Sequence, residues 1–201
     1  MNKQNQNQKQ HRHQRSALGR ISIEAMIERG PTPEFGSKVE HQLSKITGPA
    51  QSEDQADIFD LTDLLWCSID NDDSLDLDQL TVSEILPNDN VKLRVAIADV
   101  DALVKIGTPI DEHAWENTTS VYTSARIYPM LPERLSTDLT SLNPNENRLA
   151  VVTEMVFKAD GVMISSTVYR ALVHNKAKLA YDAVSAWIDG QAPLPEAAAR
   201  V

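Results

Sequence analysis

The sequence predicts an α+β fold, in which helices flank a mixed or antiparallel sheet, and not a doubly wound parallel sheet. β-Branched and apolar residues concentrate in several short runs after about residue 60, which is typical of strands. Only two segments among these runs have the pattern of amphipathic helices. The sequence contains neither a G-x-G-x-x-G nor a P-loop motif, so it does not imply a nucleotide cofactor.

The amino-terminal part is predicted to be a polar tail followed by short helices. Residues 1–15 are rich in Gln, Asn, Lys and His and have little to bury, so we expect a disordered polar tail. Residues 17–29 carry an apolar stripe at helical spacing, and Gly30 and Pro31 should end this helix. The helical leading segment of residues 16–57 is completed by a second short helix at 37–46 and a polar linker at 49–57.

The α+β domain is predicted to occupy residues 58–201. The polar run Asn-Asp-Asn at 88–90 is typical of a turn that joins two strands. The stretch that contains Pro129, Pro132 and Pro144 should be ordered loop and short helix, because proline interrupts regular hydrogen bonding. The predicted elements are strands at 64–69, 78–86, 91–98, 149–158 and 162–173 and helices at 110–117 and 177–189.

Residues 70–78 form an acidic segment in which apolar residues are set among the aspartates. Carboxylates at this density repel one another unless they are solvated, disordered or neutralised by a cation. Disorder is not expected, because residues that read as core precede the segment and leucines interrupt it. Hard carboxylate oxygens on a folded framework are ligands that Mg²⁺ or Mn²⁺ prefers. From these residues alone, a metal site for phosphate chemistry and a solvated acidic turn both stay open.

The spacing excludes one metal site, the EF-hand calcium loop. Asp70, Asp72 and Ser74 fall at ligand-like positions of such a loop. The loop also needs glycine at its sixth position and glutamate at its twelfth, and here these positions hold Leu75 and Thr81.

A set of motifs follows the acidic segment in a fixed order: Val95–Val100, Gly107–Asp111, Thr119–Tyr122, Tyr128–Ser136 and Leu139–Pro144. Together they resemble the first half of the catalytic domain of the ribonuclease II family, the RNB domain. The resemblance implies that residues 58–201 form a partial RNB-type catalytic domain. It also implies a metal-dependent 3′–5′ exoribonuclease, which hydrolyses single-stranded RNA to nucleoside 5′-monophosphates.

Carried over residue by residue, the resemblance places the metal-binding aspartates of the family on Asp70, Asp76 and Asp78, which are also the implied catalytic residues. The implied cofactor is Mg²⁺, with Mn²⁺ as an alternative. The fourth aspartate of the family is replaced by Gln79. An amide oxygen can coordinate a cation but brings no negative charge. The replacement therefore weakens a second metal or shifts that role to a neighbouring aspartate.

Tyr122 and Tyr181 match family positions that contact RNA. Aromatic stacking suits a sequence-tolerant exonuclease, because every base offers a π-face, and it contributes about 1–3 kcal/mol per base. Without the resemblance, each tyrosine reads as a half-buried core residue.

The formal net charge of −10, from 19 basic and 29 acidic side chains, opposes binding to RNA phosphates. We therefore expect RNA affinity to be weak or to depend on further parts of the protein. Cys67 is the single cysteine, which excludes an internal disulfide and fits a reducing cytoplasm. No apolar run reaches the length of about 20 residues that spans a membrane, so no membrane partner is expected.

Two other functions stay open. The first is an RNA-binding or regulatory remnant without turnover, which Gln79 and the net charge favour. The second is an unrelated acidic metal-binding protein. The resemblance implies that the later half of the catalytic domain supplies a second aromatic clamp and the arginine and glutamate at the scissile phosphate. The present residues alone are then expected to bind metal, to bind RNA poorly and to show at most trace hydrolysis.

Overall fold

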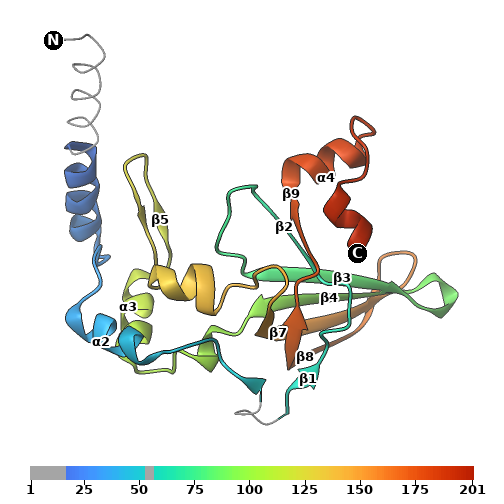
Figure 1. The fold of residues 1–201 in the computed structure, drawn as a ribbon, viewed down its shortest axis with the longest axis horizontal. Helices are drawn as coiled ribbons and strands as arrows, with labels where there is room; N and C mark the ends of the chain where they lie inside the picture. The colour runs from blue at the N-terminus through green and yellow to red at the C-terminus, as the bar shows by residue number, and fades with distance from the viewer. Residues whose placement is uncertain (1–16, 53–56) are drawn as a thin grey trace. The chain divides into compact units, whose positions relative to one another are not determined.

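The computed structural model describes residues 17–52 and 57–201 (Figure 1). The tail predicted at 1–15 lies outside the described residues. The chain divides into two units, of which the first comprises Met1–Thr47 and Val104–Glu133 and the second Gly48–Leu103 and Arg134–Val201. This division differs from the predicted boundary near residue 57, because a later segment joins the leading helices.

In the first unit, the leading helices pack with the segment at 104–133. The Asn117 side chain accepts a hydrogen bond from Thr32 N at 2.7 Å and donates one to Thr32 O at 2.9 Å. Gln42 Oε1 accepts a hydrogen bond from Ile110 N at 2.9 Å, at the start of a helix. The elements are a helix at 17–29, α2 (Ser37–Lys45), α3 (Pro109–Asn117), β5 (Val121–Tyr122) and β6 (Ile127–Tyr128). The three predicted helices are confirmed, whereas the short β5–β6 hairpin was not predicted.

The second unit is built on a seven-stranded sheet of order β1-β8-β7-β4-β3-β2-β9. The five central strands pair antiparallel, and β1–β8 and β2–β9 are parallel pairs at the two ends. The elements are β1 (Phe59–Asp60), β2 (Cys67–Asp70), β3 (Gln79–Ile85), β4 (Val91–Ala98), β7 (Asn147–Phe157), β8 (Met163–His174), β9 (Ala177–Ala180) and α4 (Tyr181–Ile188), with short helical turns at Pro87–Asp89, Val100–Ala102, Leu135–Leu139 and Glu196–Arg200. The predicted α+β class with a mixed sheet is confirmed.

The core of this unit covers one face of the sheet. Trp66 is its largest member and is fully buried, and its indole N–H donates to Leu61 O at 2.9 Å. The other buried members are Leu80, Ala96, Leu142, Ala150, Val152, Ala171 and Val173. Burial of these side chains supplies the hydrophobic stabilisation of the unit. It also fixes which residues of β3 and β4 face inward, and β3 begins where the acidic segment ends.

The predicted boundaries are wrong at two places around that segment. The helix predicted at 177–189 is a strand, β9, followed by helix α4, because residues 177–180 pair with β2. The strand predicted at 64–69 begins only at Cys67, because Trp66 ends a turn before it. Within the described part of the chain, none of the helices has the length and apolar character required to cross a membrane.

Candidate functional site

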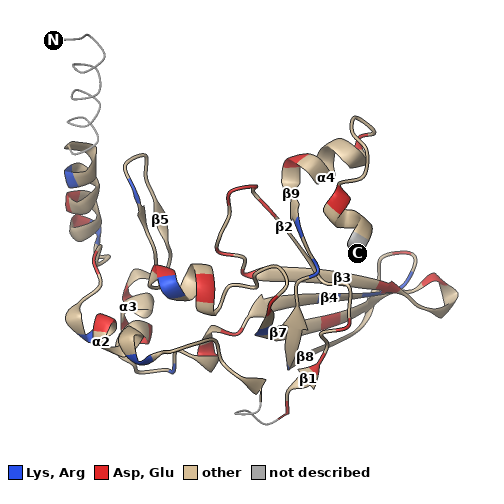
Figure 2. Ribbon diagram, in the orientation of Figure 1, with Lys and Arg blue, Asp and Glu red and all other residues tan. Residues whose placement is uncertain are grey.

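The acidic loop, residues 70–78, connects the end of β2 to the start of β3 (Figure 2). Cys67 pairs with Thr81 across these antiparallel strands. Asp70 is the last residue of β2, and Asp78 immediately precedes β3 and interacts electrostatically with Asp70. Ala98 N on β4 donates to Asp78 O at 2.9 Å and fixes the point at which the loop enters the sheet. Strand pairing therefore brings the two ends of the loop together.

Side chains alternate along the second half of the loop. Leu77 is 2% exposed and belongs to the core, whereas Asp76 and Asp78 on either side of it are exposed. Partial burial raises the pKa of Asp78 above its usual value, and the negative charges of Asp70 and Asp76 raise it further. The three carboxylates therefore lie in one electrostatic neighbourhood, and a cation would relieve their repulsion.

The first half of the loop is a tight hydrogen-bonded turn. Asp70 Oδ1 accepts hydrogen bonds from Asn71 N at 2.8 Å and from Ser74 Oγ at 2.7 Å. Lys178, on the neighbouring strand β9, donates its ammonium to Asp72 O at 3.1 Å and to Ser74 O at 2.7 Å. A positive side chain thus holds the backbone of the loop and leaves the carboxylates of Asp76 and Asp78 to face outward.

The donor chemistry of the loop fits a hard divalent cation, although the described residues contain no group of three Asp, Glu, His or Cys side chains that converge as ligands. Asp70, Asp76 and Asp78 offer carboxylate oxygens, which Mg²⁺ and Mn²⁺ prefer. These three residues would hold the ion. Gln79, the first residue of β3, instead lines a cavity of about 340 Å³ with Cys67 and residues of α4. Its role as a fourth ligand stays a prediction.

Tyr181 lies beside the acidic loop. It follows Ala180, which pairs with Asp70 in the parallel β2–β9 ladder, and it is the first residue of α4. It lines the cavity that contains Gln79 and a second one, of about 250 Å³, with loop residues 71–73. The side chain is 54% exposed, so Tyr181 is not a core residue, and its ring is accessible for stacking.

Tyr122 belongs to the first unit, on the short strand β5, and is 67% exposed. It is therefore not a core residue either, and its contact with RNA stays a prediction. Sequence reasoning assigned no role to Lys178 or to Ser141, which both hold the backbone of the acidic loop. Ser141 lies within the Leu139–Pro144 motif and Lys178 lies near Tyr181, but no local pattern pairs either residue with residues 70–78.

Comparisons with known proteins identify the family and the fold. The sequence matches the RNB domain over residues 58–199. It is 34% identical over 167 residues to ribonuclease R of Thermotoga maritima, which covers 83% of this chain and 24% of that protein. It is 37% identical over 158 residues to ribonuclease R of Escherichia coli, which covers 79% of this chain and 19% of that protein.

The fold is similar to that of Mycoplasma genitalium RNase R in complex with double-stranded RNA, with a TM-score of 0.79 and 32% identity. That alignment covers 90% of this chain and 32% of the other. The chain thus spans about a fifth to a quarter of the length of these two curated relatives.

Proposed function

The chain belongs to the RNB domain family, and from that premise we propose that it acts in a metal-dependent 3′–5′ exoribonuclease, which hydrolyses single-stranded RNA to nucleoside 5′-monophosphates. The observation that carries the proposal is the acidic loop, in which Asp70, Asp76 and Asp78 share one electrostatic neighbourhood beside the exposed ring of Tyr181. The relatives at 34% and 37% identity are named ribonuclease R, an exoribonuclease family.

Electrostatics support the metal dependence. A phosphodiester carries a negative charge, and the acidic loop alone would repel it. Bound divalent cations would neutralise the carboxylates and stabilise both the attacking and the leaving oxygen of the displacement. The task of Asp70, Asp76 and Asp78 is then to hold the cation at the end of the sheet. Tyr181 would stack on a base of any identity and place the strand beside the loop.

The second candidate is an RNA-binding or regulatory protein without turnover. Gln79 favours it, because this residue stands where the family has a fourth aspartate and brings no negative charge. The absence of a converged three-ligand group among residues 17–52 and 57–201 favours it as well. The two candidates differ in one observable, the release of mononucleotides.

A degradation assay separates them. Single-stranded RNA labelled at its 5′ end is incubated with the product of the complete gene, with Mn²⁺ or with EDTA, and beside a DNA strand of the same sequence. The proposal predicts that the RNA shortens stepwise from its 3′ end, that mononucleotides appear, and that DNA and the EDTA sample stay intact. Asp78→Asn should abolish the reaction.

Internal cuts at the first time point, or equal loss of the DNA strand, would contradict the exoribonuclease proposal. RNA that is bound but never shortened would support the second candidate. The 201-residue chain is assayed in parallel. Trace hydrolysis from it would show that the reaction needs groups outside these residues. Robust turnover that Asp78→Asn abolishes would show that these residues suffice.

A further inference from the structure

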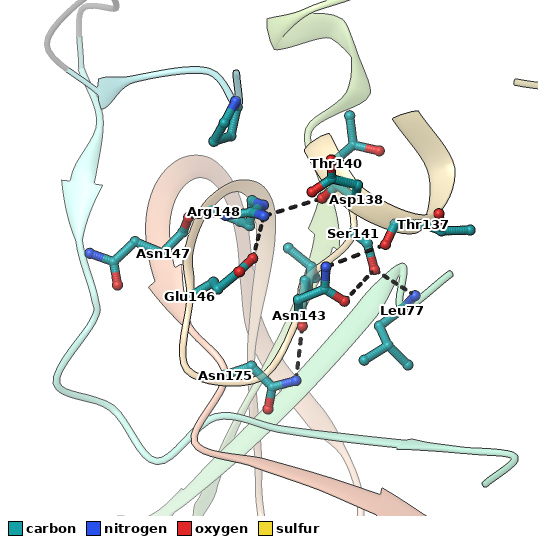
Figure 3. A network of polar contacts seen from close by, with 12 residues as sticks. Leu77, Thr137, Asp138, Thr140, Ser141, Asn143, Glu146, Asn147, Arg148 and Asn175 are labelled. Carbon is teal, nitrogen blue, oxygen red and sulfur yellow. Dashed lines mark hydrogen bonds and ion pairs between the residues drawn. The ribbon is translucent and has the colours of Figure 1, made fainter. Parts of the chain in front are cut away.

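Ser141 binds the backbone of the acidic loop through its hydroxyl group (Figure 3). It lies between the helical turn Leu135–Leu139 and β7, and only 1% of it is exposed. Its Oγ accepts a hydrogen bond from Leu77 N at 3.0 Å and donates one to Leu75 O at 2.9 Å. Asn143 Oδ1 is a second acceptor for the same hydroxyl, at 3.2 Å, so the shorter contact with Leu75 O is the stronger one. The hydroxyl thus contacts the backbone on both sides of Asp76.

Ser141 is itself fixed by its neighbours. Leu142 N donates to Leu77 O at 2.7 Å, so the two segments share a second hydrogen bond next to the first. The buried Asn175 side chain donates to Leu142 O at 2.9 Å, and Asn143 donates to Thr137 O at 3.3 Å. These amides tie the segment around Ser141 to the β8–β9 connection and to the helical turn. The position of the hydroxyl relative to the loop is therefore fixed.

We propose that Ser141 is a positioning residue for Asp76. The hydroxyl fixes the backbone groups before and after this aspartate, while the buried Leu77 side chain prevents rotation of the segment between them. The direction in which the Asp76 carboxylate leaves the loop is then set by Ser141. This inference rests on the proposed metal site, but its first readout is metal affinity and not turnover.

The neighbouring residue offers a matched control. Thr140 Oγ1 donates to Leu135 O at 3.0 Å, and its side chain is also buried, so Thr140→Val removes a buried hydroxyl one position away. That hydrogen bond stays within the helical turn and does not reach the acidic loop. Each of the variants Ser141→Ala and Thr140→Val therefore loses a buried hydroxyl. Only the hydroxyl of Ser141 contacts the backbone next to Asp76.

Mn²⁺ affinity is measured for both variants by following the electron paramagnetic resonance of free Mn²⁺ during titration. Removing an outer partner of a metal ligand commonly lowers metal affinity by about 10- to 100-fold. We expect a loss of this size in Ser141→Ala and an unchanged dissociation constant in Thr140→Val. In the metal-free chain, the amide of Leu77 should exchange with solvent faster in Ser141→Ala and at the original rate in Thr140→Val.

Ser141→Thr tests for rescue, since it keeps the hydroxyl, and it replaces the alanine variant if the latter does not fold. Affinity that is restored in Ser141→Thr supports a positioning role. Equal Mn²⁺ affinity in Ser141→Ala and the unaltered chain, or an equal loss in Thr140→Val, would overturn the inference alone. An unaltered chain that binds no Mn²⁺ would overturn both the proposed function and the inference that rests on it.

Discussion

Replacing Asp78 with asparagine should have opposite effects on stability with and without metal. Asp78 is a partly buried carboxylate that interacts with two other negative charges, Asp70 and Asp76. Asparagine has nearly the same shape but carries no charge, so the variant removes the repulsion and also the negative charge that attracts a cation. We therefore expect Asp78→Asn to stabilise the metal-free chain and to remove most of the stabilisation by a divalent cation.

The two effects differ in size. A pair of exposed charges contributes about 0.2–1 kcal/mol, so the loss of two repulsive pairs should stabilise the metal-free chain by about 0.4–2 kcal/mol. For a domain of this size, about 1 kcal/mol changes the Tm by roughly 2–4 °C, which gives a rise of about 1–8 °C. A cation at 100 times its Kd stabilises the folded chain by about 2.7 kcal/mol, or roughly 5–11 °C.

The measurement is thermal unfolding followed by circular dichroism, in EDTA and at increasing Mn²⁺. The unaltered chain should have the lower Tm in EDTA and the higher Tm at saturating Mn²⁺, so the two curves of Tm against metal concentration cross. Asp160→Asn is the control, because Asp160 is exposed in the β7–β8 turn and its Oδ1 accepts a hydrogen bond from Val162 N that an amide oxygen preserves.

Curves of Tm against Mn²⁺ concentration that run parallel for Asp78→Asn and the unaltered chain would contradict the prediction. If Asp78→Asn gained as much stability from Mn²⁺ as the unaltered chain, the acidic loop would be a solvated turn and any bound ion would lie elsewhere. If Asp160→Asn lost the metal response as well, the response would be an effect of net charge and not of a site.

Three further predictions concern other contacts of the second unit. Burial alone would raise the pKa of Glu154, but hydrogen bonds from Arg94 and Tyr169 lower it, so this carboxylate stabilises the fold above its unfolded pKa and stops doing so as the pH falls through its folded pKa. Urea unfolding should show that Glu154→Gln lowers the free energy of unfolding by about 1–3 kcal/mol at pH 7, with solvent screening favouring the lower end. This difference should narrow as the pH falls below 4, and a difference independent of pH would contradict the prediction. Lys178→Met should accelerate hydrogen exchange of the amides in the acidic loop and Lys178→Arg should not, and equal exchange in both variants would show that the ammonium does not hold the loop. The role of Tyr181 is tested by fluorescence anisotropy with labelled RNA, in the Asp78→Asn background so that the RNA is not degraded. Tyr181→Ala should weaken RNA binding by about 1–3 kcal/mol, and Tyr181→Phe should retain it. An equal loss in both variants would point to the hydroxyl and not to stacking.

Local patterns were sufficient to predict most of the sheet. The strand at 91–98 was predicted at its observed bounds, since its apolar residues alternate with polar ones on a half-buried surface. The segment at 177–180 was misread as helix, because Ala and Leu also suit a helix and only the pairing with β2 makes it a strand. The union of residues 104–133 with the leading helices was missed for the same reason, since the Asn117–Thr32 contact joins segments far apart in the sequence.

The sequence identifies the charged residues of the candidate site but not the residues that support them, and the metal-binding role of the aspartates stays a prediction. The density and spacing of aspartates at 70–78 can be read from the sequence, and the structure places Asp70, Asp76 and Asp78 in one neighbourhood. Ser141 and Lys178 carry no such pattern, because a serine or a lysine acquires its role here only from the backbone groups that it meets. Such long-range partners follow from the register of the sheet, which no window of sequence contains.

The parallel pairing of β2 with β9 has a consequence for the order in which the protein is made. Asp70 meets Ala180 in this ladder, so the aspartates leave the ribosome well before the strand that completes their surroundings. At about 5–20 residues per second, a separation of roughly 100 residues corresponds to a delay on the order of 5–20 s. Closing so long a connection is also slow compared with local structure formation, which makes β9 a late addition to the sheet. We expect a nascent chain that ends before residue 177 to carry the charges of the acidic loop without Lys178 to hold its backbone.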